Sequence, residues 1–257
     1  MKIITWNINS IRARTDKLLD WLKVAQPDVL CLQELKCTDD QFPMLELGAA
    51  GYQCAVYGQK TYNGVAILSK TPPEEVLRGF GDGADDEQSR VISATIGGIR
   101  VICVYAPNGQ SVGSPAYAYK LEWYGRLKRH LAAKFNPAMP VLVCGDFNVM
   151  PEALDVWDPE LFNGQCLFSP AERAALKATA EPLQLVDLFR SRNPEVPGYT
   201  FWDYQAGRFH KNHGLRIDHM HVTAPLAARC TAMGVDRDAR KNPKPSDHAP
   251  LWAEFSG

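Results

Sequence analysis

The segment Val141-Leu142-Val143-Cys144-Gly145-Asp146-Phe147-Asn148 carries the most information about the fold. Its first four residues are apolar and predict a buried strand. A glycine follows, and then a carboxylate at Asp146 and a carboxamide at Asn148. Side chains two positions apart in an extended segment point the same way, so both should face one spot at the open end of a sheet. Such an oxygen-rich pair suits a water molecule or a hard cation. An ordinary turn after a strand remains an equal alternative for this segment alone.

Other predicted strands carry polar side chains at their ends as well. They are Asn7-Ile8-Asn9 after residues 2–6, Gln33-Glu34 after residues 28–32, Ser246-Asp247-His248 before residues 249–255, and the block Leu215-Arg216-Ile217-Asp218-His219. Each alone has an ordinary explanation, since amides cap turns and an acid beside an arginine is usually a solvated pair. Sites in α/β sheets form where strands end, so the repetition indicates a functional edge.

Length and composition are those of a globular protein. The chain has 257 residues, 46% hydrophobic and 22% charged, with no low-complexity linker and no solenoid repeat, and we expect a single domain over residues 1–257. Its 7 cysteines form no Cys-x-x-Cys pair. This indicates a reduced, cytoplasmic protein with Cys31, Cys103 and Cys144 in its core. Neither a leader's apolar region nor a membrane-length apolar run occurs in the sequence.

Charge is balanced overall and unevenly distributed. The formal net charge is −1, so any surface that attracts phosphate must be local. The segment between Tyr199 and Arg216 interleaves aromatic residues with arginine, lysine and histidine, a pattern typical of nucleic-acid contacts. An ordinary half-buried loop is the alternative. A second basic run spans residues 237–244, and the acidic residues 82–87 predict a solvated loop.

Local patterns predict mixed α/β structure. Helices are expected at residues 15–25, capped by Thr15-Asp16, at residues 117–135, and after a capping box that begins at Ser169. Strands are expected at residues 64–68, 91–96 and 100–105, the last two joined through Gly97-Gly98. Because hairpins and β-then-α order occur together, a purely parallel doubly wound sheet is excluded.

Six blocks of the sequence resemble those of exonuclease III-like AP endonucleases, in the same order and over almost the whole chain. They are Asn7-Ile8-Asn9, Leu32-Gln33-Glu34-Leu35-Lys36, Tyr105-Ala106-Pro107-Asn108-Gly109, Gly145-Asp146-Phe147-Asn148, Gly214-Leu215-Arg216-Ile217-Asp218 and Ser246-Asp247-His248-Ala249-Pro250. The blocks around Asp146 and Asp247 are shared with the wider endonuclease/exonuclease/phosphatase superfamily. The resemblance implies an α/β four-layer sandwich: two packed mixed β-sheets flanked by helices.

The resemblance also implies a Mg²⁺-dependent phosphodiesterase, with Mn²⁺ as a possible substitute. Its metal region would contain Glu34 as the principal ligand, with Asn7, Asn9 and Asp247; some members carry Asp at the position of Asn9. Asp146 would position and deprotonate the attacking water, helped by Asn148. Asp218 would orient His248 toward the phosphate, as in other hydrolases. Tyr105 and Asn108 would contact the scissile phosphate.

Substrate recognition is expected at Phe201, Trp202, Leu215, Arg216 and Ile217, where relatives line a pocket for a sugar without a base. The expected substrate is double-stranded DNA with abasic sites or damaged 3′ ends, hydrolysed 5′ to the abasic site with accompanying 3′-to-5′ exonuclease or 3′-end cleaning activity. A monomer is expected. Alternatives are a specialised 3′–5′ exonuclease or 3′-phosphodiesterase with little AP endonuclease activity, a cousin acting on RNA ends or small phosphoesters, and a non-catalytic DNA-end binding protein.

Overall fold

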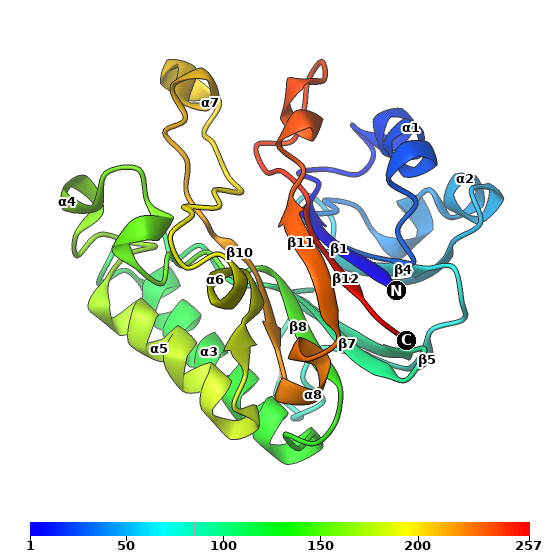
Figure 1. The fold of residues 1–257 in the computed structure, drawn as a ribbon, viewed down its shortest axis with the longest axis horizontal. Helices are drawn as coiled ribbons and strands as arrows, with labels where there is room; N and C mark the ends of the chain where they lie inside the picture. The colour runs from blue at the N-terminus through cyan, green and yellow to red at the C-terminus, as the bar shows by residue number, and fades with distance from the viewer. Residues whose placement is uncertain (85) are drawn as a thin grey trace.

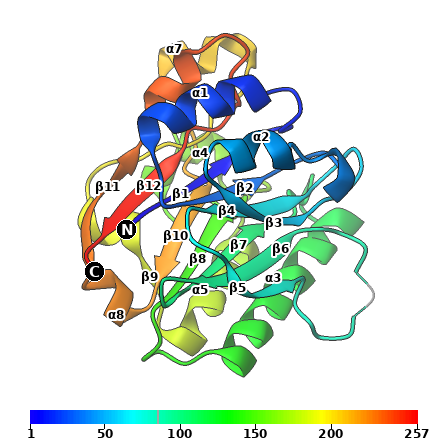
Figure 2. The same ribbon diagram turned by 90° about the vertical axis from the view of Figure 1, so that its right-hand side faces the viewer.

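Two six-stranded mixed sheets lie face to face in the computed structural model, which describes residues 1–84 and 86–257. Figure 2 shows the layers: α1 and α2 cover one sheet, and α3 and α5 cover the other. The predicted α/β architecture of two packed mixed sheets flanked by helices is confirmed.

The first sheet has the order β11 (Cys230–Val235), β12 (Leu251–Phe255), β1 (Lys2–Asn7), β2 (Val29–Gln33), β4 (Val65–Ser69) and β3 (Gln53–Tyr57). The second has the order β5 (Glu74–Arg78), β6 (Val91–Ile96), β7 (Ile99–Tyr105), β8 (Val141–Asp146), β10 (Asp218–Val222) and β9 (Val186–Asp187). The helices are α1 (Thr15–Ala25), α2 (Met44–Ala49), α3 (Pro115–Lys134), α4 (Pro159–Phe162), α5 (Pro170–Ala180), α6 (Leu188–Arg192), α7 (Arg208–Lys211) and α8 (Ala224–Ala227). A 3₁₀ turn, η5, spans Arg237–Lys241.

Each sheet contains one parallel pair, β1 with β2 and β7 with β8. The carboxyl ends of parallel strands meet at one edge of their sheet. Strand β10 runs antiparallel to β8, with Asp218 opposite Asp146, so it begins where β8 ends. Strand β12 runs antiparallel to β1 and likewise begins near its carboxyl end. The topology therefore brings the polar strand ends predicted from the sequence to one edge of the sandwich (Figure 1).

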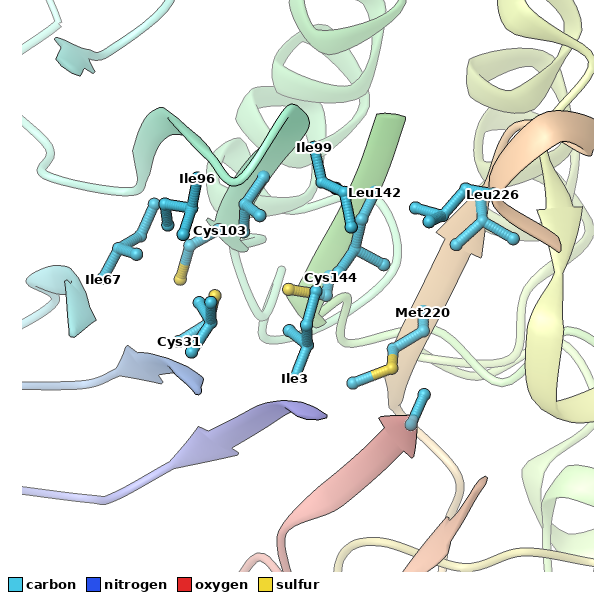
Figure 3. Close-up of a cluster of buried hydrophobic side chains, with 14 of the residues drawn as sticks. Ile3, Cys31, Ile67, Ile96, Ile99, Cys103, Leu142, Cys144, Met220 and Leu226 are labelled. Carbon is cyan, nitrogen blue, oxygen red and sulfur yellow. The ribbon is translucent and has the colours of Figure 1, made fainter. Parts of the chain in front are cut away.

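The core between the sheets is apolar and includes the three predicted cysteines. Figure 3 shows Cys31 from the first sheet facing Cys103 and Cys144 from the second, beside Ile3, Leu142 and Met220. All three cysteines are fully buried. Close packing of this layer fixes the two sheets relative to one another, and with them the two halves of the polar edge.

Most of the local predictions hold, with one correction. Ser169 and Glu172 form the reciprocal capping box of α5, and Gly97-Gly98 joins β6 to β7 with positive φ at both residues. Thr15, however, does not cap α1: the helix begins at this residue, and its hydroxyl donates to the Ile11 carbonyl instead. No helix in the described part of the chain is long and apolar enough to cross a bilayer.

The acidic segment 82–87 is a loop whose described residues are exposed apart from the half-buried Asp86, as predicted, but two of its carboxylates are paired. Asp82 and Asp86 both pair with Arg126 of α3, and Tyr119 donates to the Asp86 carboxylate. Asp85 lies outside the described residues. The carboxylates thus attach this segment to a helix, because the guanidinium fork can meet two acids at once.

Candidate active site

Asn7 links the ends of the two parallel strand pairs. Its buried amide nitrogen donates to Glu34 Oε1 at 2.9 Å and to Asp146 Oδ2 at 3.0 Å. Tyr105, the last residue of β7, donates its hydroxyl to the same Glu34 oxygen at 2.9 Å. The resemblance placed Asn7 in the metal region, and its amide lies against Glu34. One carboxamide therefore holds two carboxylates, one from each sheet, at a fixed separation.

Asp146 and Asn148 lie together, but not for the reason that strand alternation suggested. Strand β8 ends at Asp146, and Asn148 takes a left-handed conformation with φ of 50°. The Asn148 amide donates to Asp146 Oδ1 at 2.9 Å, which closes a turn on the carboxylate. Its side-chain nitrogen donates to the Ala106 carbonyl, and its side-chain oxygen accepts from Asn108 at 3.4 Å. Both asparagines thus join the edge through a turn and not through an extended strand.

His248 is held by Asp218 on one side and approaches Asp146 on the other. Its Nδ1 lies 2.8 Å from Asp218 Oδ2, and its Nε2 lies 3.8 Å from Asp146 Oδ2. Burial alone would lower the pKa of His248, but the Asp218 carboxylate outweighs it and raises that pKa to about 10. A protonated imidazole can then donate from Nε2 to an anionic oxygen placed beside Asp146.

The two carboxylates joined by Asn7 have opposite electrostatic settings. Burial, together with the nearby Asp218 and Glu34, raises the pKa of Asp146 to about 7 despite the opposing effect of His248. For Glu34, burial also favours the neutral acid, but the bond from Asn7 and the charge of Lys36 lower its pKa overall. The lowered pKa of Glu34 favours its ionised form, whereas Asp146 can take up and release a proton near neutral pH.

The donor set around Glu34 fits a divalent metal ion. One ligand atom from each of Glu34, Asp146 and His248 lies within 4.8 Å of the others. The Lys36 ammonium lies 2.9 Å from Glu34 Oε2 and 2.6 Å from Asn9 Oδ1, so a cation is already accommodated between two of the expected metal ligands. Asn9 also donates to Asp247 at 2.9 Å. Carboxylate and amide oxygens are the ligands that Mg²⁺ and Mn²⁺ prefer.

Three of the expected substrate residues, Phe201, Leu215 and Ile217, form an apolar wall that Phe201 joins to His248. Leu215 and Ile217 belong to a buried cluster with Phe168, and Phe201 packs against its edge. The Phe201 ring meets the His248 ring edge-on, with centroids 5.0 Å apart. This wall lies next to the imidazole that would face the phosphate.

Trp202 and Arg216, which are also expected to contact substrate, are each 1% exposed, close to the 2% of Ile217. Trp202 packs against Phe209 beneath Arg237. Arg216 binds Asp155 at 2.6 Å and Asp187 at 2.8 Å. Partners distant in sequence enclose both side chains, so Trp202 and Arg216 anchor residues 199–216 to the rest of the protein.

The family of the chain follows from comparison with known proteins. The model of the Endonuclease/Exonuclease/phosphatase family matches residues 4–248. A curated relative, exodeoxyribonuclease III of Haemophilus influenzae, is 38% identical over 99% of this chain and 100% of its own length. The chain belongs to the exonuclease III/AP endonuclease family. It is an exodeoxyribonuclease III-type DNA repair nuclease.

Solved structures of other family members superpose over the full length. The 3′ phosphatase NExo from Neisseria, bound to a product DNA hairpin, has a TM-score of 0.97 and 40% identity, with all of both chains covered. An AP endonuclease from Archaeoglobus fulgidus has a TM-score of 0.96 and 39% identity, again with all of both chains covered. A relative named as a 3′ phosphatase and one named as an AP endonuclease are thus about equally similar to this nuclease in sequence and structure.

Sequence reasoning about this nuclease assigned no role to Lys36 or Lys120. Lys36 stood inside the block that contains Glu34, and its position two residues from the predicted metal ligand was the available signal. Lys120 had no such signal, because it is a lone lysine in a helix and its partners lie in other segments.

Proposed function

We propose that this nuclease hydrolyses the DNA backbone 5′ to abasic sites in a metal-dependent reaction and also trims or cleans 3′ ends. The observation that carries the proposal is Asp146, a buried carboxylate with a pKa raised to about 7 beside a histidine that an acid orients. A base with a pKa near the working pH combines the right protonation state with useful proton affinity. Asp146 would accept a proton from water as the water oxygen attacks phosphorus and the 3′ oxygen leaves.

The surrounding donors have defined tasks in this reaction. His248 would donate from Nε2 to a non-bridging phosphate oxygen, while Asp218 keeps the imidazolium in place. Tyr105, Asn108 and Asn148 would complete the cradle for the phosphate. A divalent metal held by Glu34, with Asn7, Asn9 and Asp247 close by, would neutralise phosphate charge when bound.

Recognition of an abasic nucleotide is supported by the apolar wall of Phe201, Leu215 and Ile217. A sugar that lacks its base can enter a space that excludes an intact nucleotide. Beyond the wall, the segment that carries α7 and the segment that carries η5 project on the same side of the molecule (Figure 1). Exposed Tyr204, on the α7 segment, donates to the Pro245 carbonyl of the other segment at 2.8 Å, accepts from Arg14 at 3.2 Å and packs against Arg240. Aromatic and cationic side chains in this arrangement suit a DNA strand.

A second candidate is a 3′-end processor with little AP endonuclease activity. The Neisseria relative carries the name of a 3′ phosphatase and is as similar as the Archaeoglobus AP endonuclease. Removal of a 3′ phosphate or a 3′ nucleotide would use the same water, base and imidazolium. The two candidates differ only in whether an internal abasic site can be seated against the wall.

The test is cleavage of three labelled duplexes: one with a central abasic site, one with a recessed 3′ end and one with a 3′ phosphate. Each is incubated with Mg²⁺ or chelator, using the wild type, Asp146→Asn and, as a matched control at an exposed carboxylate, Asp20→Asn. Metal-dependent incision at the abasic site that only Asp146→Asn abolishes supports the first candidate. Processing of 3′ ends without incision supports the second, and cleavage of none of the three contradicts both.

A further inference from the structure

Lys120 is a fully buried lysine in α3 whose three ammonium protons all have partners. Its Nζ donates to the main-chain carbonyl of Asn108 at 3.0 Å, to that of Asn148 at 2.7 Å and to Glu172 Oε1 at 2.5 Å. An ion pair that only joined α3 to α5 would need the last bond alone. The first two bonds end on the residues whose carboxamides belong to the phosphate cradle.

Glu172 extends this network to a third segment. Its Oε1 also accepts from the Leu167 amide at 3.0 Å, and its Oε2 accepts from the Ser169 amide at 3.1 Å. The Leu167 carbonyl in turn accepts from the Met150 amide, two residues beyond Asn148. The carboxylate thus holds the loop that supports the chain just after the Asp146 turn.

The backbone around Asn108 is shaped to meet the ammonium. Gly109 follows with φ of 93°, and a Cβ there would lie 3.0 Å from Lys120 Cδ and 3.1 Å from Cys166 Sγ. Asn148 adopts a left-handed conformation, and its carbonyl accepts the shorter of the two hydrogen bonds that Lys120 donates to main-chain carbonyls. Such conformations persist when the surroundings over-determine them.

We propose that Lys120, paired with Glu172, is a positioning residue: its buried ammonium fixes the Asn108 and Asn148 backbones and thereby aims both carboxamides at the scissile phosphate. The inference rests on the proposed function. It predicts that loss of the ammonium lowers kcat by misplacing the cradle, separately from any loss of fold stability.

The experiment separates these effects with three variants. Lys120→Met leaves Glu172 buried without its cation and should be unstable. Lys120→Met with Glu172→Gln removes both charges, keeps an oxygen for the Ser169 amide, and should recover most of the stability. Leu127→Ala, a buried position two turns further along α3, is the control that loses stability without touching either asparagine.

Unfolding midpoints, kcat and KM are measured for each variant at a temperature where all are folded, on the best substrate of the wild type. We expect the double variant to regain a near-native midpoint while kcat stays at least about ten-fold low, and Leu127→Ala to show the reverse. A double variant with wild-type kcat would overturn the proposal, since the ion pair would then be structural only.

A second readout is independent of the substrate. The side-chain amide signals of Asn108 and Asn148, followed by NMR in the full-length protein, should shift or broaden in the double variant and stay unchanged in Leu127→Ala. Unchanged signals in the double variant would overturn the positioning role even if the wild type cleaved no DNA. Absence of wild-type cleavage with shifted signals would instead contradict the proposed function and leave the positioning role supported.

Discussion

Two buried clusters of charge in this protein are built on different principles. One, which we call the catalytic cluster for its proposed role, contains Glu34, Asp146, Asp218 and His248. The arginine cluster contains Asp155, Asp187, Arg190 and Arg216. In the arginine cluster each carboxylate meets a guanidinium, and Arg216 helps to hold the pKa of Asp187 well below its usual range although burial opposes this. In the catalytic cluster three carboxylates share one imidazole and the ammonium of Lys36, and burial raises the pKa of Asp146.

The difference separates stability from chemistry. A fully paired cluster gains nothing from a further proton or cation, so it can only support the fold. The catalytic cluster is left with excess negative charge, which suits it to accept a proton or a metal ion. Strongly shifted carboxylates of this kind concentrate at functional sites. The comparison predicts opposite consequences when one carboxylate is neutralised in each cluster.

The largest effect is expected for Asp146→Asn. Without a base at this position, kcat should fall by about a thousand-fold or more, equivalent to about 4 kcal/mol of barrier. The unfolding free energy in chelator should change little, because removal of a buried charge beside two other carboxylates offsets the loss of an accepting oxygen for Asn7 or Asn148. Single-turnover cleavage and denaturant unfolding measure the two quantities. Retention of the wild-type rate would show that Asp146 is not the base.

The second effect concerns Asp155, which is fully buried and accepts from Arg216 and Arg190. Asp155→Asn leaves two guanidinium groups short of a counter-charge and should lower the unfolding free energy by roughly 3–4 kcal/mol. The protein that remains folded should keep its kcat, since Asp155 contacts none of the catalytic cluster's polar atoms among the described residues. A variant with native stability and impaired turnover would break the distinction between the clusters.

The third effect is the pH dependence of stability in chelator. The folded pKa of Asp146, raised to about 7, lies above the unfolded value, so its contribution is complete below about pH 4 and is lost as pH rises through 7. Stability should therefore fall by roughly 2 kcal/mol between about pH 5 and 7. The depressed pKa of Asp187 contributes in the opposite sense, and only as pH falls below about 4. Unfolding of Asp146→Asn should lose most of the slope between pH 5 and 7, leaving only what the raised pKa of His248 contributes above about pH 6.5. An unchanged slope would assign it elsewhere.

The sequence predicted the catalytic cluster better than the arginine cluster, and the topology explains why. Asn7, Glu34 and Asp146 follow apolar strands, and parallel strand ends meet at one edge whatever the details of packing. Strand patterns are local, as the agreement at residues 91–96 illustrates. The convergence of these side chains could therefore be predicted from the hydrophobic periodicity of the chain together with the family resemblance.

The burial of a side chain by partners distant in sequence could not be predicted in this way. The sequence places Arg216 in a segment rich in aromatic and basic residues, and the acids that enclose it are not nearby in the sequence. Asp155 and Asp187 lie 61 and 29 residues away in the chain. Trp202 is covered by Arg237 from another segment in the same way. Asn148 was expected in an extended segment because an asparagine after a strand is compatible with both an extended and a left-handed backbone. The sequence does not distinguish these two conformations, and the structure has the left-handed one.

The smallest effect tests whether the excess negative charge of the catalytic cluster holds a cation. Mg²⁺ or Mn²⁺ at about ten times its dissociation constant should raise the unfolding free energy by about 1.4 kcal/mol, because it binds the folded state only. Glu34→Gln should abolish the increase. Lys36→Met should strengthen metal binding, since the ammonium that competes for Glu34 and Asn9 is gone, whereas Lys128→Met at an exposed pair should change nothing. Thermal unfolding against metal concentration measures all four proteins without reference to turnover.

Two outcomes would contradict this account. Stabilisation that survives in Glu34→Gln would place the metal elsewhere. Weaker binding in Lys36→Met would mean that the lysine arranges the metal ligands and does not occupy the position of the metal ion.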